Sequence, residues 1–149
     1  MAQTTGGVSL RNAKIEFSTN SSDWVDVSGV TNKINPSGAD RKSGEAWTAD
    51  GDDAIVTVGK SEPVEVEVTV VYTETSTEGY LYMHGYRANA TPLRLRWAPK
   101  GASTGNYRYT TSTGYVIACL PPGGDVESGD PILGAFTVKA PGYAAAAIS

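Results

Sequence analysis

Hydrophobic and polar residues alternate along two segments in the middle of the chain, at 64–72 and 93–97. The valines at 64, 66, 68 and 70 alternate with Glu65, Glu67 and Thr69, and Leu93, Leu95 and Trp97 alternate with Arg94 and Arg96. This period of two predicts extended strands with one face in a core and the other face outside it. The outward-facing residues of the two strands form the candidate functional face: Glu65, Glu67, Thr69, Arg94 and Arg96.

Weaker alternation predicts further strands on both sides of this central pair. They are expected at 13–18, 24–28, 54–58, 106–111, 114–120 and 134–140. The chain holds 17 glycines and 8 prolines, which implies many turns between short strands. The sequence therefore predicts an all-β protein, as a single domain over residues 1–149.

One helix is expected between the two central strands, at about 76–89. Thr75 and Glu78 have the spacing of a capping box, in which each side chain satisfies a backbone N–H at the start of a helix. Thr91 precedes Pro92, and a residue before proline is forced out of helical geometry, so the helix ends there.

Apolar periodicity is absent from about 31–53, which predicts a long polar loop. Polar excursions of this length in a compact domain tend to be functional or disordered. The candidate contact residues in and beside it are Asn35, Arg41, Lys42, Glu45, Trp47, Asp50, Asp52 and Asp53. At the other end, residues 143–149 follow the last predicted strand and are expected to form a flexible tail.

The charge balance and the absence of long apolar runs restrict the function. The chain has a net charge of -4 and a pI near 4.9, which argues against a surface that grips nucleic acid phosphates. No apolar run approaches the roughly 20 residues of a membrane helix. Residues 1–7 have neither a basic start nor an apolar stretch, so we expect no secretory signal and folding in a cytoplasm.

Residues that bear catalytic or metal-binding chemistry do not form a convincing motif. The segment 59–61 resembles the end of a phosphate-binding loop, but Ala54 stands where the first glycine is required. The acidic segment 50–53 lacks the third ligand and the glycine of a calcium loop. His84 is the single histidine and Cys119 the single cysteine, and Cys119 lies within an apolar strand. We therefore expect no enzyme, no cofactor and no metal.

The order of elements resembles the tail tube proteins of long-tailed (siphovirus-type) bacteriophages or of related gene-transfer particles. The resemblance rests on the strand at 64–72, the helix at 75–89, the strand at 93–97 and the closing segment at 130–142. It covers roughly residues 8–142 and is one of layout, without an invariant motif.

The resemblance implies a β-sandwich or half-open barrel with one flanking helix, which assembles into stacked hexameric rings around a channel. The candidate face would then line the channel or contact a neighbouring subunit, and the loop at 31–53 would reach the next ring. An acidic subunit suits a channel that repels DNA. The implied partners are further copies of the chain, a tape-measure protein, tail terminator and distal tail proteins, and double-stranded DNA that passes non-specifically. The implied location is the virion, after assembly in the host cytoplasm, without a membrane.

Two other functions are compatible with the sequence. A monomeric β-sandwich that binds carbohydrate, or an adhesin-like module, would need an aromatic platform. Its candidate residues are Tyr80, Tyr82, Tyr86, Tyr107 and Tyr109. An enzyme would have to depend on a pairing of Cys119 with His84.

Overall fold

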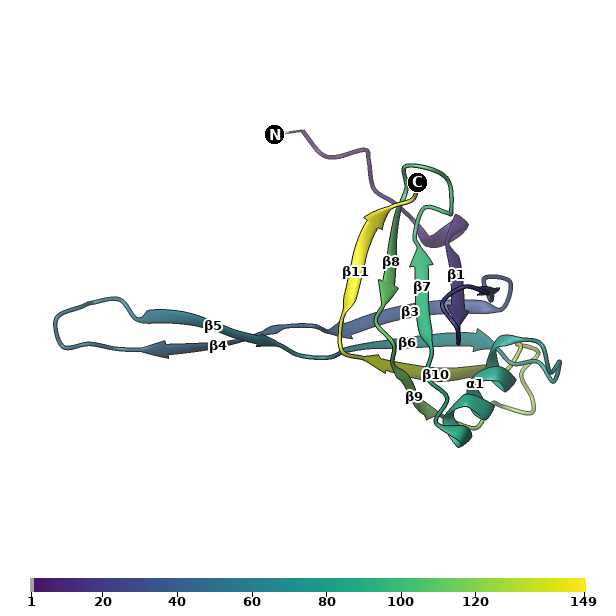
Figure 1. The fold of residues 1–149 in the computed structure, drawn as a ribbon. Coiled ribbons are helices and arrows are strands. Elements are labelled where there is room, and N and C mark those ends of the chain that lie inside the picture. The colour runs from purple at the N-terminus through teal and green to yellow at the C-terminus, as the bar shows by residue number, and fades with distance from the viewer. Residues whose placement is uncertain (1) are drawn as a thin grey trace.

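Two antiparallel sheets pack face to face in the computed structural model, which describes residues 2–149. Their strands run across one another, and a two-stranded ribbon projects far from one end (Figure 1). Sheet A has the order β11 (Tyr143–Ala147), β8 (Tyr107–Thr111), β7 (Arg94–Ala98), β1 (Lys14–Ser18), β2 (Val25–Asp26). Sheet B has the order β3 (Thr31–Gly38), β6 (Val64–Val71), β10 (Leu133–Ala140), β9 (Tyr115–Cys119). The ribbon is β4 (Arg41–Ala46) and β5 (Ile55–Ser61).

The core fills the space between the inner faces of the two sheets. Strand β6 contributes its alternating valines, which are at most 3% exposed, and β10 contributes Phe136 and Val138. On the facing side, sheet A contributes Phe17, Leu95 and other apolar residues of β1 and β7. Because directly opposed residues of antiparallel strands share a face, this register directs the polar residues outward on both sheets. The predicted all-β fold with one helix is confirmed.

Helix α1 (Gly79–Asn89) covers β9 and β10. It begins at Gly79 rather than Ser76, and the predicted capping box is not formed. Residues 75–78 make a tight turn instead, in which the Glu78 N–H donates to the Thr75 carbonyl and the Glu78 carboxylate accepts from the Thr73 hydroxyl. The predicted end is confirmed, with Ala90 in the left-handed region at φ 51°.

The segment predicted as a polar loop at 31–53 is mostly strand. β3 pairs with β6 along its whole length, from Thr31 opposite Val70 to Gly38 opposite Val64. The prediction was wrong here because β3 is an edge strand with one buried side chain, Ile34, so it shows no apolar period. An edge strand also accepts a proline such as Pro36, which a central strand does not.

The C-terminal segment, predicted as a flexible tail at 143–149, contains strand β11 at the edge of sheet A. It pairs with β8, with Tyr143 opposite Thr111 and Ala147 opposite Tyr107. Its alanines carry no hydrophobic alternation, and all five residues of β11 are exposed. Main-chain pairing, with a single aromatic contact between Tyr143 and Tyr109, therefore positions this segment, which explains why the side-chain pattern did not predict it.

Leucines in β7 and after β9 provide a matched test of the core. Leu95 is fully buried between the sheets, whereas Leu120 is 68% exposed. We expect Leu95→Ala to lower the free energy of unfolding by about 2–5 kcal/mol, since it removes buried methyl groups and leaves a cavity. Leu120→Ala should change it by less than about 0.5 kcal/mol. Urea denaturation measures both, and equal losses would contradict the assigned core.

Candidate functional site

Glu65, Glu67 and Thr69 lie together on the outer face of sheet B, between the buried valines of β6. Strand pairing extends this face on both sides. The residues of β3 and β10 directly opposite them are Lys33, Asn35, Ser37, Ala135, Thr137 and Lys139. This set of nine residues of β3, β6 and β10, called here the outer face of sheet B, consists of four charged side chains, four short polar ones and one alanine.

Charge on the outer face of sheet B is balanced rather than acidic. The Lys139 Nζ lies 3.5 Å from the Glu65 Oε1, and both side chains are nearly half exposed. Glu67 stands opposite Asn35 and Thr137, and Lys33 stands opposite Thr69. Two carboxylates and two ammonium groups therefore share the face. The excess acid of the chain lies elsewhere.

Arg94 and Arg96 do not belong to this face. They lie on β7 in sheet A and alternate with the buried Leu95 and Trp97, so they point away from the core on the opposite side of the sandwich. The sequence placed them with Glu65 because both strands alternate in the same way, and alternation does not tell which sheet a strand joins.

Arg96 forms a buried ion pair with Glu16 of β1. Its Nε lies 3.0 Å from the Glu16 Oε1 and its Nη2 lies 3.2 Å from the Oε2, a two-pronged geometry that suits a guanidinium. The guanidinium carbon also lies 3.9 Å from the ring centre of Trp24. Glu16 is only 6% exposed. The pair therefore joins β1 to β7 and is structural.

Strands β3 and β9 are the two edges of sheet B within the described residues 2–149. An edge strand presents unpaired N–H and C=O groups, which in a free monomer invite pairing with another chain. The lone ribbon adds a second unpaired element, because both of its strands are open on their far sides. Sheet B and the ribbon thus offer four strand edges, β3, β9, β4 and β5, where a further strand could join.

The ribbon is connected to sheet B through a well-defined change of backbone direction at Gly38 and Ala39. Gly38 and Ala39 have φ angles of 81° and 63°, and a Cβ on Gly38 would lie 2.4 Å from the Pro63 carbonyl oxygen. The Glu62 N–H donates to the Asp40 carbonyl at 2.7 Å and closes the base. The ribbon therefore continues β3 and β6 beyond the sandwich (Figure 1).

Large apolar side chains of the ribbon and its tip are exposed to solvent: Trp47, Ile55, Val56 and Val58 are 55–68% exposed. Of the contact residues expected from the sequence, Arg41, Lys42 and Glu45 lie on β4, whereas Asn35 lies on the outer face of sheet B. The others, Trp47, Asp50, Asp52 and Asp53, lie in the connection at 47–54. The strand predicted at 54–58 lies in this ribbon, and the exposure of its apolar residues was not predicted.

The expected chemistry of an enzyme is not assembled around Cys119. Burial raises the pKa of the Cys119 thiol, which is the reverse of what a nucleophile needs. His84 is exposed and stacks on Tyr80, with ring centres 6.2 Å apart. Residues 2–149 also contain no group of three potential metal ligands.

The five tyrosines of the expected sugar platform are dispersed. Tyr80 is buried and donates its hydroxyl to the Leu120 carbonyl at 2.8 Å. Tyr82 and Tyr86 pack edge-on against Phe17, whereas Tyr109 stacks on Trp97. A single platform therefore does not form from them. In the same part of the chain, 2–149, no helix has the length and apolarity that a membrane span requires.

Comparison with known proteins identifies the fold. No protein-family model matches the sequence, and no curated protein matches it. Solved structures do match. A chain of the sheath and tube terminator of an extracellular contractile injection system, in its extended state, gives a TM-score of 0.73 at 14% identity, over 97% of this chain and 100% of that one.

Two phage-related structures match over similar lengths. The SPP1 tail tube gives a TM-score of 0.67 at 12% identity, over 95% of this chain and 80% of that one. The virion of a native gene transfer agent gives 0.64 at 7% identity, over 99% of this chain and 100% of that one. The chain has the fold of components of these tails and injection systems, and the resemblance to tail tube proteins is confirmed at the level of fold.

The two arginines of β7 allow a test of their assignment. Arg96→Ala should lower the free energy of unfolding by about 1.5–3 kcal/mol, because it removes two charge-assisted hydrogen bonds from the Glu16 carboxylate, which then keeps only the Lys14 Nζ at 4.0 Å. Arg94→Ala removes only a hydrogen bond to Thr113, at 3.2 Å on the surface, and should cost about 1 kcal/mol or less. Thermal or urea unfolding compares the two. A large loss for Arg94 alone would contradict this view of β7.

Proposed function

We propose that the chain is the structural subunit of a tail-like tube, in which hexameric rings stack around a channel. The observation that carries this proposal is sheet B, which has two free edges, a polar outer face and a ribbon that continues two of its strands. The fold likeness, which extends over nearly the whole chain, supports it.

Ring closure would satisfy the edges of sheet B. Strand β3 of one subunit would pair with β9 of the next, so that each subunit contributes four strands to a continuous barrel. A closed barrel abolishes the unpaired edges that threaten a monomer with aggregation. This head-to-tail contact closes because repeated rotation returns to the first subunit.

The outer face of sheet B would line the channel, with Glu65, Glu67 and Thr69 among its residues. Balanced charge and short polar side chains give a wall with little affinity for phosphates, since binding to DNA depends on uncompensated cations. Arg94 and Arg96, on sheet A, would then face the outside of the tube.

The ribbon would be the arm between rings. An isolated two-stranded hairpin is marginally stable in water, and a cluster of exposed apolar residues marks a contact surface. Trp47, Ile55, Val56 and Val58 would be buried against the adjoining ring, with the acidic tip residues at the rim of the contact.

The remaining partners follow from this role. The tube would hold a tape-measure protein, meet tail terminator and distal tail proteins at its ends, and pass double-stranded DNA non-specifically. The subunit would be assembled in the host cytoplasm, reside in the virion and have no catalytic role. The raised pKa of the Cys119 thiol and the dispersed tyrosines favour this role over an enzyme or a sugar-binding module.

Removal of the ribbon tests the proposal directly. Residues 41–61 can be replaced by Asn-Gly, a two-residue hairpin turn, because Asp40 and Glu62 are already hydrogen-bonded. We expect negative-stain microscopy of concentrated protein to show tubes for the unmodified chain, and single rings or monomers for the shortened one. Circular dichroism should show that the shortened chain keeps its β structure.

A quadruple variant keeps the ribbon and removes only its exposed apolar side chains, so it separates the loss of these contacts from the loss of the segment. Alanine in place of Trp47, Ile55, Val56 and Val58 should abolish stacking as the deletion does. Full-length tubes from the shortened chain would refute the role of the arm. Unmodified protein that stays monomeric at every concentration and salt would refute the tube itself.

Charge reversal of the outer face of sheet B tests the channel. Glu65→Lys with Glu67→Lys leaves four cations and no anion on that face. Tubes of this variant should retain short linear duplex DNA at 50 mM salt in a co-sedimentation assay, with at least about a tenfold loss of affinity by 200 mM. Unmodified tubes should retain none.

A circular plasmid provides the control, since it cannot thread a channel. Retention of linear DNA without retention of plasmid agrees with an inward-facing surface. Retention of both would put Glu65 and Glu67 on the outside. The double reversal Asp23→Lys with Glu74→Lys, at two exposed positions outside the outer face of sheet B, the ribbon and the β9–β10 loop, controls for the change in net charge.

A further inference from the structure

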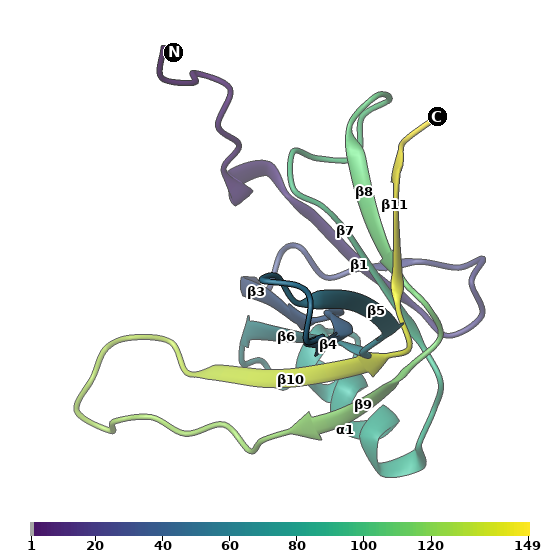
Figure 2. The ribbon, with the colours of Figure 1, turned by 90° about the vertical axis from the view of Figure 1, so that its left-hand side faces the viewer.

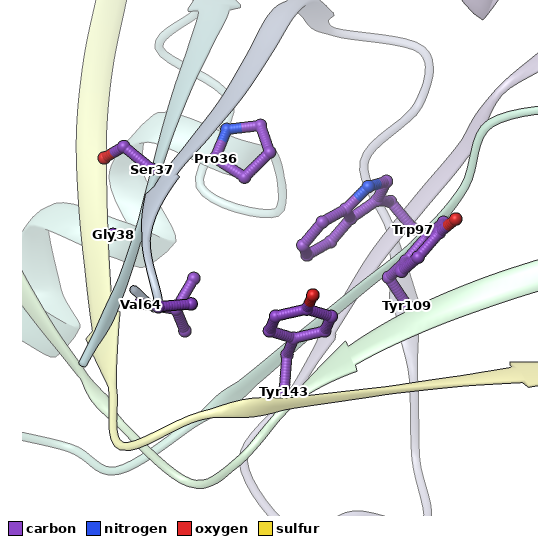
Figure 3. Close-up of a pocket in the computed structure, with 8 residues that line it drawn as sticks. Pro36, Ser37, Gly38, Val64, Trp97, Tyr109 and Tyr143 are labelled. Atoms are coloured by element: carbon purple, nitrogen blue, oxygen red, sulfur yellow. The ribbon is translucent and has the colours of Figure 1, made fainter. Parts of the chain in front are cut away.

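An aromatic cleft opens beside the base of the ribbon, where sheets A and B diverge (Figure 3). Its volume is about 340 Å³. Trp97, Tyr109 and Tyr143 line one side: Trp97 and Tyr109 are stacked with ring centres 5.8 Å apart, and the Tyr143 ring is tilted against Tyr109 at 6.4 Å. Val64 and Pro36 line the other side. The residues that line the cleft come from five strands or their ends, so no single segment of the sequence predicts it.

The cleft is apolar, open and bordered by lysines. Tyr143 is 52% exposed although its ring lies against Tyr109. A second, larger hollow shares Ser37 and Gly38 with the cleft and is lined by Lys42, Lys60 and Lys139 against Glu62 and Glu65. Since Glu65 is already paired with Lys139, the rim keeps a positive balance.

The loop between β9 and β10, residues 120–132, has the opposite character. Val126 is 99% exposed at its tip. A hydrogen-bonded turn presents it: the Asp125 carboxylate accepts from the Glu127 N–H at 3.0 Å, and the Asp125 carbonyl accepts from the Ser128 N–H at 3.1 Å. The loop carries Asp125, Glu127 and Asp130 and no basic residue. It projects to the side, away from sheet A (Figure 2).

The cleft and the loop lie at opposite ends of the same strand. Leu133, where the loop returns to the sheet, pairs with Val71, whereas Ala140 pairs with Val64 at the cleft. Seven residues of extended strand separate these ends by about 23 Å. One chain therefore cannot bring its own loop to its own cleft, but a second copy placed head to tail can.

We propose that the β9–β10 loop of one copy inserts Val126 into the aromatic cleft of the next copy along the stack. This inference rests on the proposed tube and assigns a second contact between rings, separate from the ribbon. Burial of Val126 against Trp97 and Tyr143 removes apolar surface from water on both sides. The acidic loop meets the lysine rim, and this complementarity orients the contact.

The tip of another copy's ribbon is the alternative partner for the β9–β10 loop, and its charge argues against this contact. The tip of the ribbon carries Glu45, Asp50, Asp52 and Asp53 without a basic residue between 45 and 54. Docked on the β9–β10 loop, it would bring two acidic segments together, which like-charge repulsion disfavours. The cleft is the surface that complements the loop in both polarity and charge.

Disulfide trapping tests the contact. Val126→Cys and Pro36→Cys variants are mixed, assembled and oxidised, and dimers are counted on a non-reducing gel. We expect a cross-linked dimer from the mixture and from neither variant alone. Cys119 is buried and serves as background in the unmodified chain. A mixture of Val8→Cys with Pro36→Cys, in which Val8 is 59% exposed outside the loop, should give no dimer.

The outcomes separate this inference from the proposed function. Tubes without the cross-link overturn the loop contact and leave the tube intact. A cross-link without tubes supports the contact and counts against the ring. Neither tubes nor a cross-link overturns both.

Substitution at the tip of the loop gives an independent measure. Val126→Asp should raise the protein concentration needed for assembly at least about tenfold, since it places a fourth carboxylate at an apolar contact, while Val126→Ile should leave it within about twofold. Both variants should melt at the same temperature as the unmodified chain, because the side chain touches little in the free subunit. Equal assembly of the two variants would overturn the contact.

Discussion

Burial of the β6 valines is the constraint on which the rest of the molecule depends. Their four side chains lie against sheet A at 0–3% exposure, so the intervening residues must point outward. Because side chains alternate with a period of two, a slip of one residue would bury Glu65 and Glu67 and expose every valine. The same strand also fixes the register of β3 and β10.

Sheet A depends on a different interaction, the pairing of Arg96 with Glu16. Charges of this kind contribute little net stability when they replace apolar residues, but they tolerate only one arrangement of their neighbours. The pair sets Glu16 opposite Arg96 in the ladder of β1 and β7. It thereby keeps Ile15 and Phe17 turned toward the valines of β6. The two sheets are thus specified by different chemistry on either side of one core.

The parts that the sequence predicts well are those with a buried face. Strands β6, β7 and β10 and the end of α1 lie where alternation and Pro92 place them. Strands β3, β4 and β11 were not predicted, because an edge strand or a lone ribbon buries almost no side chain. Its sequence therefore shows no alternation of apolar residues. The outer face of sheet B was half predicted: Glu65, Glu67 and Thr69 lie together, but pairing, which alternation does not reveal, separates Arg94 and Arg96 from them. The cleft depends on residues more than a hundred positions apart, from Pro36 to Tyr143, and leaves no local pattern.

The ribbon carries exposed apolar residues, which favour association, beside acidic residues, which oppose it. Trp47, Ile55, Val56 and Val58 would make free subunits stick to one another through any apolar surface that they met. Glu45, Asp50, Asp52 and Asp53 stand beside them, and clustered acids on every copy repel in solution. Charged residues that flank a sticky strand are the usual protection against disordered aggregation. The colloidal stability of the unassembled subunit is therefore governed by the tip of its ribbon, at the point farthest from the core.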